Sequence, residues 1–461
     1  MRILLSKPYL LFTILFVASR ACFHAAGQTF FAWHASMMHF VDLQVLQADV
    51  WQTLWYLHGQ PPLMSVFLAS VLAPVDYDYS RSIPIFRSLF LIGGLVLGWA
   101  WIHTLMRAGL RPLTSVAVAV GFSLLPACIV YERYLFYTYP VVVLLALMGM
   151  FMIRAIQAPG FRTWTWVFLL AAILALFKGV FHLAWMLGLV GILWRLSARK
   201  DRRVVLVASI LPLLLVAGWY GKNLALHGQF KTSSWVGIGL ARKTYHLLPA
   251  EERAALARRI DPIIGVDIFG SVAQFAEVVP MPEPTGVRLL DEPSRVDGSI
   301  NFHHAIYVEG CDRMVAAAWQ SILEDPRPYA RNVLETIQLM FEPASLWWPV
   351  VRPRNEARVY CTAVDLLLHG HWGVRGINCW SVLTLVTLLG GGVVSVRSLR
   401  RPAEAQATDA LITAATFTAV FILAVSALFD AQEANRHRFL VDGVIVLAAV
   451  LLACRWRRPA R

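Results

Sequence analysis

The chain has 461 residues, of which 58% are hydrophobic and only 15% are charged, and its formal net charge is +13. A soluble protein carries about 25% charged residues, so this composition excludes an ordinary soluble enzyme. The basic residues gather in short turns between apolar blocks, which argues against a nucleic-acid-binding surface and favours a polytopic membrane protein.

Ten apolar blocks have lengths that fit one crossing of a bilayer. They cover residues 8–22, 84–106, 113–130, 137–156, 163–178, 180–196, 204–226, 379–396, 409–428 and 439–455. No small-residue cleavage motif follows the first block, so we expect a retained helix and not a signal peptide. Residues 63–73 are too short to cross and end at Pro74, which favours a re-entrant or interfacial helix. The sequence predicts an all-α polytopic membrane protein of about ten transmembrane helices.

The distribution of charge predicts the orientation of these helices. With the N-terminus inside, every predicted inside turn is basic, as the positive-inside rule requires. Residues 23–83, 131–137, 178–182, 227–378 and 430–438 then lie outside. We expect an N-terminal membrane core at 1–226 with the external loop 23–83, an extracytoplasmic helical segment at 227–378, and C-terminal transmembrane helices at 379–461.

The external loop contains a stretch, residues 40–63, with two carboxylates, several aromatic residues and no Lys or Arg. Asp42 lies just after the first helix, where it could take a proton from an acceptor hydroxyl as a general base. Alternatively, it could pair with an outside Arg or Lys and hold the loop. Asp49 lies two helical turns further on, as a second site carboxylate or a solvated charge. His58 could face the same pocket.

The turn at residues 131–139 places an acid and a base, Glu132 and Arg133, among four tyrosines. Tyrosines alone would form an ordinary interface belt. The added charges indicate that Glu132 lines a pocket, with Arg133 and Tyr137 beside it.

Several cations and polar residues lie at the predicted outer ends of helices. They are Lys178, His182, Lys222, Asn223, Arg436 and Arg438. Such cations could converge on a phosphate that becomes anionic when a glycosidic bond breaks. The plainer interpretation is that they snorkel to lipid headgroups.

Asp42, followed eighteen residues later by Gln60-Pro61-Pro62-Leu63, resembles the first external loop of GT-C glycosyltransferases. The nearest branch contains protein O-mannosyltransferases and lipid A aminoarabinose transferases, and is glycosyltransferase family 39-like. That branch usually has Glu after the Asp and His or Lys before Pro-Pro-Leu, where this chain has Leu43 and Gln60. The run from Asn435 to Phe439 resembles the family's basic motif before the last span.

The resemblance implies a GT-C-type bundle in a bacterial inner membrane, with its active site on the periplasmic side. It implies inverting, metal-independent transfer of a hexosyl or pentosyl group from a polyprenyl-phosphate donor to a hydroxyl of a protein, glycan or lipid, without a cofactor. The catalytic residues would be Asp42 and Glu132. Substrate contacts would come from Asp49, His58, Gln60, Arg133, Tyr137, Lys178, His182, Lys222, Asn223, Arg436 and Arg438.

Two further observations bear on this function. Asp76-Tyr77-Asp78 is a D-x-D sequence, which some GT-C enzymes use for a divalent ion, but the branch that the chain resembles generally works without one, so no metal is predicted. A transporter or lipid-linked-sugar flippase could use the same outside charges as a substrate path. The halves of the chain lack the similarity that many transporters show.

Overall fold

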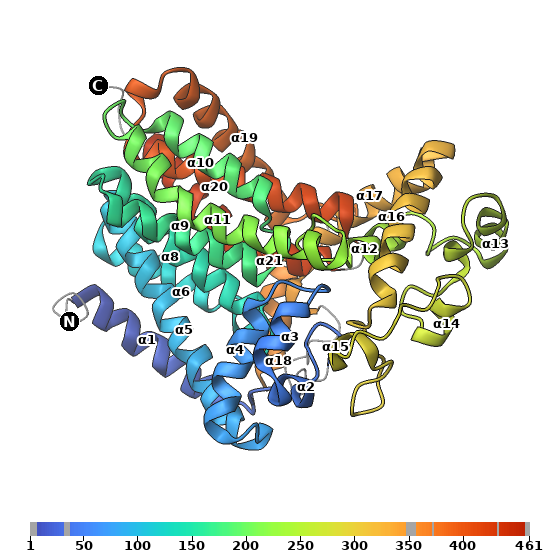
Figure 1. Ribbon diagram of the computed structural model, residues 1–461. Coiled ribbons are helices and arrows are strands. Elements are labelled where there is room, and N and C mark those ends of the chain that lie inside the picture. Colours follow the sequence, from blue (N-terminus) through green and yellow to red (C-terminus); the bar gives the residue numbers. More distant parts are fainter. Residues whose placement is uncertain (1–6, 32–36, 347–355, 371–372, 431–432, 457–461) are drawn as a thin grey trace.

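The computed structural model describes residues 7–31, 37–346, 356–370, 373–430 and 433–456. The regular structure of these residues is helical apart from two isolated β-bridges, Phe31 with Tyr134 and Ser294 with Ile300. A bundle of long helices forms one side of the molecule, and a second group of helices extends from one end of it (Figure 1). We call this end of the bundle, where α12–α17 lie, the cap end.

Seven helices are long and apolar enough to cross a membrane, which supports a multi-pass membrane protein. They are α1 (Lys7–Ala25), α5 (Tyr79–Arg107), α8 (Thr138–Gln157), α11 (Arg202–His227), α19 (Cys379–Arg400), α20 (Ala407–Phe429) and α21 (Ala434–Trp456). Each corresponds to one of the ten predicted spans.

The other three predicted spans form shorter helices. Two of them are α9 (Phe161–Phe177) and α10 (Leu183–Leu196). The third, 113–130, divides into α6 (Pro112–Ser123) and α7 (Pro126–Tyr131), because Pro126 has no N–H to donate and forces Leu125 out of helical geometry. The apolar piece after Leu63 is the ten-residue helix α4 (Leu63–Leu72), which packs against α5 and α9.

Small residues let α1 approach α5 closely. A Cβ atom added at Gly98 would overlap the Phe12 ring, and one added at Gly94 would overlap the Phe16 ring. Phe12 and Phe16 lie one turn apart on α1, with ring centroids 5.7 Å apart. This arrangement of small residues one turn apart is typical of membrane helix contacts.

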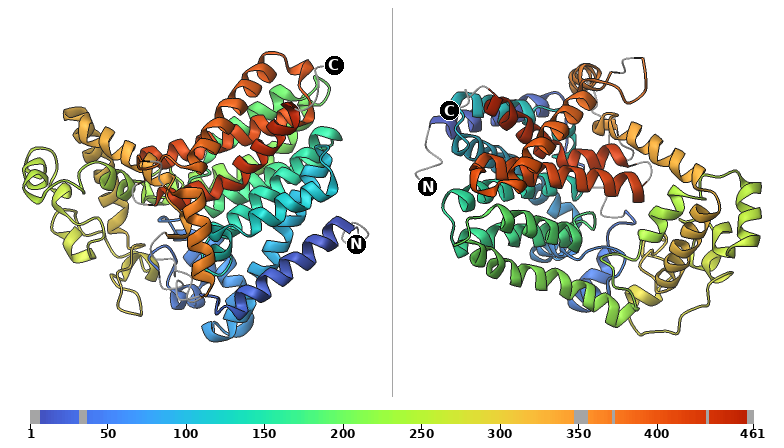
Figure 2. Two further views of the ribbon diagram at one scale, coloured as in Figure 1. Left: turned by 180° about the vertical axis from the view of Figure 1, so that it is seen from behind. Right: turned by 90° about the horizontal axis from the view of Figure 1, so that it is seen from above.

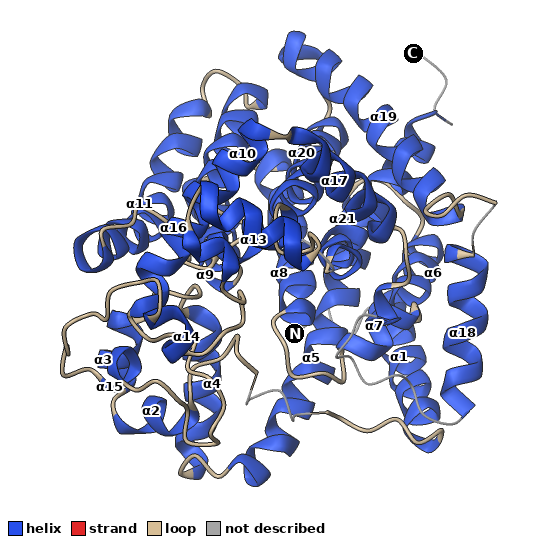
Figure 3. Cartoon of the chain, turned by 90° about the vertical axis from the view of Figure 1, so that its right-hand side faces the viewer, coloured by secondary structure: helices blue, strands red, loops and turns tan. Residues whose placement is uncertain are grey.

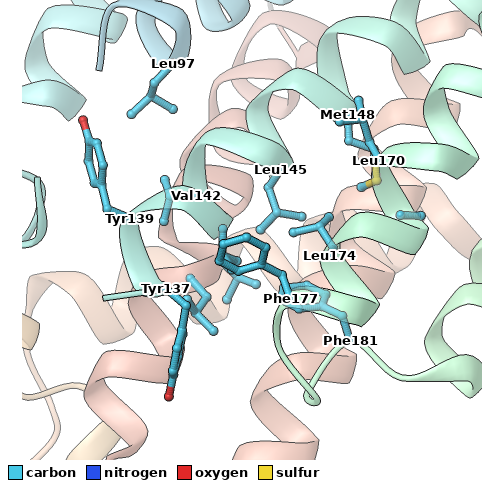
Figure 4. Packing of buried hydrophobic residues seen from close by; sticks show 14 of the residues in the cluster. Leu97, Tyr137, Tyr139, Val142, Leu145, Met148, Leu170, Leu174, Phe177 and Phe181 are labelled. Carbon is cyan, nitrogen blue, oxygen red and sulfur yellow. The ribbon is translucent and has the colours of Figure 1, made fainter. Parts of the chain in front are cut away.

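Helix α8 lies inside the bundle, in contact with α5, α9, α20 and α21. Figure 4 shows its side chains, among them Leu145 and Met148, directed at Leu170 and Leu174 of α9. Three other helices complete the bundle. Helix α11 packs against α9, α10 packs against both α9 and α20, and α19 packs against α20. This packing brings the ends of α9, α10, α20 and α21 together at the cap end.

The basic turns meet at the opposite end of the bundle. Gln157 Nε2, at the end of α8, donates to the Arg107 carbonyl at the end of α5 over 2.8 Å. Arg455 of α21 pairs with Asp409 at the start of α20. The start of α1 and the end of α21 lie on this side too (Figure 2). The turns that were predicted to share one side of a membrane therefore do lie at one end.

The predicted segment 227–378 divides into two parts. Its first part has an apolar core of its own, built by α12 (Val236–Lys243), α13 (Ala250–Arg259), α14 (Val272–Ala276) and α16 (Ile306–Glu324). The second part packs on the bundle: α17 (Pro326–Met340) covers α20 and α21, and α18 (Glu356–His369) covers α7 and α19. The external loop forms α2 (Leu43–Ala48) and α3 (Val50–Tyr56), and α3 contacts α15 (Arg288–Asp291) (Figure 3).

Candidate functional site

A cavity of about 420 Å³ lies at the cap end, between the ends of the bundle helices and α12. Its size is within the range of about 300–1,000 Å³ that small-molecule sites occupy. The charged and imidazole side chains that line it are His39, Lys178, His182, Lys231, Arg242, Asp430, Glu433 and His437. The site therefore combines elements that are distant in the sequence.

One hydroxyl group organises the cations beside this cavity. Tyr137 Oη, just before α8, accepts hydrogen bonds from Lys178 Nζ at 2.6 Å and from Arg436 Nη1 at 2.5 Å. Lys178 Nζ also lies 4.2 Å from the centroid of the Tyr137 ring. Burial holds the pKa of Lys178 well below its ordinary value, and Arg436 lowers this pKa further. The two cations are thus held close together around one hydroxyl group.

Carboxylates occupy the neighbouring part of the wall. Asp430 follows α20, and its Oδ2 lies 2.9 Å from Nδ1 of His437 in the first turn of α21. Glu433 pairs with Arg436. Burial would raise the pKa of Asp430, but His437, Arg242 and Arg436 more than offset this effect and hold the pKa well below its usual range. These neighbours favour the charged form of Asp430.

Asp430, Glu433 and His437 offer ligand atoms within 4.8 Å of one another, so their composition fits a divalent cation. Their present partners do not favour one, because Arg436 already neutralises Glu433 and Arg242 acts electrostatically on Asp430. As the side chains stand, the surroundings of this group are more favourable to an anion.

The rest of the wall is mostly apolar. Val425 and Phe429 come from α20, and Tyr220 comes from α11. Phe230, beside α11, is 55% exposed. Charged and apolar side chains therefore line one cavity at the end of a membrane-type bundle.

Five of the predicted site residues come together here. Gln60, Lys178 and His182 line the cavity, and Tyr137 and Arg436 form the cationic cluster beside it. His182 Nδ1 also accepts from the Ala184 N–H at the start of α10, over 3.3 Å. Each of the five lies near an end of a bundle helix or of the external loop.

Asp42, the predicted base, does not line this cavity. Its Oδ1 accepts from the Gln44 N–H and caps α2, and its Oδ2 accepts from the Val296 N–H, both at 2.8 Å. Arg295 Nε lies 3.9 Å from the same carboxylate. In this structure the Asp42 carboxylate therefore joins the external loop to the cap. Met38 and His39, just before it, are the residues of this loop that line the cavity together with Gln60.

Four more predicted contacts lie outside the cavity wall. Asp49 is exposed and caps α3 through the Gln52 N–H at 2.8 Å. His58 is buried between Ser234 Oγ at 2.8 Å and the His303 carbonyl at 2.9 Å. Lys222 Nζ donates to the Leu57 carbonyl at 2.6 Å, and Asn223 Nδ2 donates to the Lys231 carbonyl at 2.7 Å. His58 thus joins the loop to the segment after α11, Lys222 joins α11 to the loop, and Asn223 joins α11 to that segment.

Glu132 faces away from the cavity. It accepts hydrogen bonds from Arg20 Nε at 2.8 Å, from Arg20 Nη2 at 2.7 Å and from Tyr139 Oη at 2.9 Å. Figure 4 shows Tyr137 and Tyr139 leaving the start of α8 in opposite directions, so the Glu132 cluster is on the other side of this helix from Lys178. Arg133 lies on the Glu132 side as well, where both residues line a separate cavity.

Arg438 is the last predicted contact outside the site. Its Nε lies 3.1 Å from Asp442 Oδ1, and its Nη1 donates to the Met340 carbonyl at 2.8 Å, beneath the end of α17. The residues predicted as one site thus divide among the cavity, the Glu132 cluster, the Arg438 pair and several loop contacts.

The sequence prediction did not include His39, Lys231, Arg242, Trp235, Asp430, Glu433 or His437. Asp430, Glu433 and His437 lie within the polar outside turn 430–438, so the same reasoning that selected Arg436 could have found them. Arg242 lies on α12, and its local sequence gives no indication of its place in the wall.

Comparison with known proteins adds no relative: no family model, no curated protein and no solved structure matches this chain.

Proposed function

We propose that the protein is an integral membrane glycosyltransferase that uses a polyprenyl-phosphate-linked sugar, with the cavity at the cap end as its donor site. The observation that supports this most is the cluster of Lys178, Tyr137 and Arg436 beside an apolar opening, at one end of a membrane-type bundle. A phosphate that carries a long hydrocarbon chain needs both features.

The cations would stabilise the leaving phosphate. Charge develops on this group as the glycosidic bond breaks, and preformed cations in a site shielded from water act most strongly there. Lys178 supplies a point charge and Arg242 a planar fork from the opposite wall. Neutral His39, whose pKa is lowered by burial and by the neighbouring cations Arg436 and Lys178, offers a hydrogen-bonding group to a sugar hydroxyl.

Asp430 is the carboxylate that we assign as the general base. It lines the cavity beside the cations, which favour its charged form. The acceptor oxygen forms a bond to the anomeric carbon while the bond between that carbon and the phosphate oxygen breaks. The electron pair leaves with polyprenyl phosphate, the hydroxyl proton passes to Asp430, and the anomeric configuration inverts. The step requires no metal ion or cofactor.

The proposal includes the orientation given by the basic turns, with the cap end outside the cell membrane. In a bacterium this is the periplasmic side of the inner membrane. The acceptor would be a hydroxyl of a protein, glycan or lipid that reaches this side.

The test is a transfer assay on purified protein in lipid nanodiscs, with a panel of radiolabelled polyprenyl-phosphate sugars and an envelope extract as acceptor. General acid–base catalysis contributes about 10²–10⁴-fold to a rate. Asp430→Asn is therefore expected to slow transfer about 100-fold or more, while Asp42→Asn, the same change at a loop-holding residue, retains most of the rate.

Other outcomes have defined meanings. If the Asp430→Asn protein is active and the Asp42→Asn protein is folded but inactive, the general base is Asp42 and not Asp430. If no donor supports transfer, and a labelled lipid-linked sugar moves between the leaflets of proteoliposomes, the protein is a flippase and not a transferase.

A further inference from the structure

A second cavity, of about 290 Å³, lies between α1 and α5, on the Glu132 side of the start of α8. Its polar lining combines one carboxylate with several cationic or neutral polar side chains: Glu132, Arg20, Arg87, Arg133, His24 and Gln28. The donor site described above uses none of these residues. The transfer reaction therefore leaves this cationic cavity without a role.

The charge of the cavity is only partly balanced. Glu132 neutralises Arg20 through two short hydrogen bonds. Among the described residues, no carboxylate lies within ion-pair distance of Arg87 or Arg133. Burial lowers the pKa of Arg133 to about 10; Glu132 acts in the opposite direction, and the like charges of Arg20 and Arg87 add to the lowering. Arg133 Nη2 donates to the Arg20 carbonyl over a long 3.5 Å, so its guanidinium can still donate to an anion, as can that of the exposed Arg87.

A buried hydrogen-bond donor supplies an independent observation. Gln28 is only 8% exposed, it lines the cavity, and its Nε2 is buried without a hydrogen-bond partner among the described residues. A buried donor without an acceptor is unfavourable, and native proteins rarely retain one. An oxygen atom of a bound group would complete it.

The position of the cavity along the helices fits a lipid headgroup. Arg87 and Arg107 are about 30 Å apart along the axis of α5, which is about the thickness of the hydrocarbon core, and no charged residue lies between them. Val17 of α1 and Ile92 of α5, which both line the cavity, are 55% and 54% exposed. The cavity therefore has its charges at the boundary of the bilayer and an apolar opening toward it.

We propose that this cavity binds the phosphate group of an anionic membrane lipid. Arg87, Arg133 and Gln28 donate to the phosphate oxygens, and the hydrocarbon chain lies along Val17 and Ile92. The phosphate belongs either to a phospholipid or to a polyprenyl monophosphate. Neither choice depends on the transfer reaction.

The test is native mass spectrometry of delipidated protein titrated with phosphatidylglycerol, polyprenyl monophosphate or diacylglycerol, which has no phosphate. Arg87→Gln is compared with Arg111→Gln, the same change at an exposed residue of the opposite end. A hydrogen bond to a charged group is lost only in the first variant, so we expect about tenfold weaker binding of at least one phosphate lipid there and no change in the control.

Gln28→Leu gives a second measurement that does not depend on a charge. Removal of an unpartnered buried donor is expected to raise the thermal midpoint of the lipid-free protein. The same variant should show a smaller rise of the midpoint on addition of the phosphate lipid. A structural role without a ligand would leave the lipid-induced shift unchanged.

The two lipid arms identify the source of the phosphate. If Arg87→Gln weakens the binding of phosphatidylglycerol alone, the phosphate belongs to a bilayer phospholipid. If it weakens the binding of polyprenyl monophosphate alone, the phosphate belongs to the carrier lipid. Two results would overturn the proposal. One is that diacylglycerol binds as strongly as both phosphate lipids, and the other is that Arg87→Gln and Arg111→Gln have equal affinities for them.

Discussion

The Tyr137 hydroxyl is the acceptor that Lys178 and Arg436 share, over 2.6 and 2.5 Å. Two buried cations so close together repel each other, and the Tyr137 oxygen and the Glu433 carboxylate, which pairs with Arg436, offset part of the cost. Under the proposed function, a bound phosphate would offset more of it.

This arrangement makes phosphate binding depend on pH. The protonated form of Lys178 binds the anion, and its pKa in the free protein is lowered by burial and by Arg436. Bound phosphate raises the pKa of Lys178 again. Binding therefore takes up a proton once the pH exceeds the pKa that Lys178 has in the free protein. Above pH 7.5, where the phosphate is fully ionised, the affinity for polyprenyl monophosphate should fall as pH rises, by up to about tenfold per pH unit. Isothermal titration calorimetry in nanodiscs measures this slope.

Lys178→Arg is the matched control for the slope. Its guanidinium remains charged throughout this range, so its affinity should be nearly independent of pH. Identical slopes in the two proteins would assign the titration to another group and contradict the role of Lys178.

For single residues, the sequence indicates which of them lie at the same end of the bundle. Lys178, His182 and Arg436 lie at helix ends on one side, which follows from the order of the predicted spans. The direction of the Asp42 carboxylate cannot be predicted in this way, because it is set by the Val296 N–H, 254 residues away in the sequence. Glu132 and Tyr137 are close in the sequence, but the turn between α7 and α8 directs their side chains to different partners.

Among the elements, the contact of α1 with α5 depends on the absence of side chains at Gly94 and Gly98. Gly98→Val should push the Phe12 ring out of its place and destabilise the protein by about 1–3 kcal/mol, as overpacking does. Gly121→Val is the matched control, because a Cβ atom at Gly121 of α6 meets nothing within 4 Å. Thermal unfolding in detergent, followed by circular dichroism, compares the two. Equal midpoints would contradict the close packing described here.

Element prediction was most reliable for long apolar blocks. The seven helices that are both long and apolar were each predicted as a separate span, since length and hydropathy are properties of a local window. The block 113–130 was predicted as one span because its hydropathy continues through Pro126, although the proline ends the helix. The division of residues 227–378 was not predicted, because it depends on which surface α17 covers.

For the whole molecule, the basic turns at one end and the cap at the other predict the sidedness of the protein. Two variants with one added cysteine each test it in a protein without the exposed Cys22 and Cys379. Glu283→Cys in the cap loop should react with a membrane-impermeant maleimide in intact spheroplasts, and Lys200→Cys between α10 and α11 should react only after permeabilisation. The reverse pattern would invert the proposed topology and place the cavity in the cytoplasm.

The attachment of the external loop to the cap also has a genetic consequence. Arg295 Nη1 donates to the Met37 carbonyl at 2.9 Å, and the Val296 N–H donates to Asp42, so the short segment that carries Met38 and His39 is fastened at both ends to the cap. Neither Arg295 nor Val296 lines the cavity. A substitution at Arg295 would nevertheless move Met38 and His39. A screen for altered acceptor preference would therefore recover changes in the cap as readily as changes in the cavity itself.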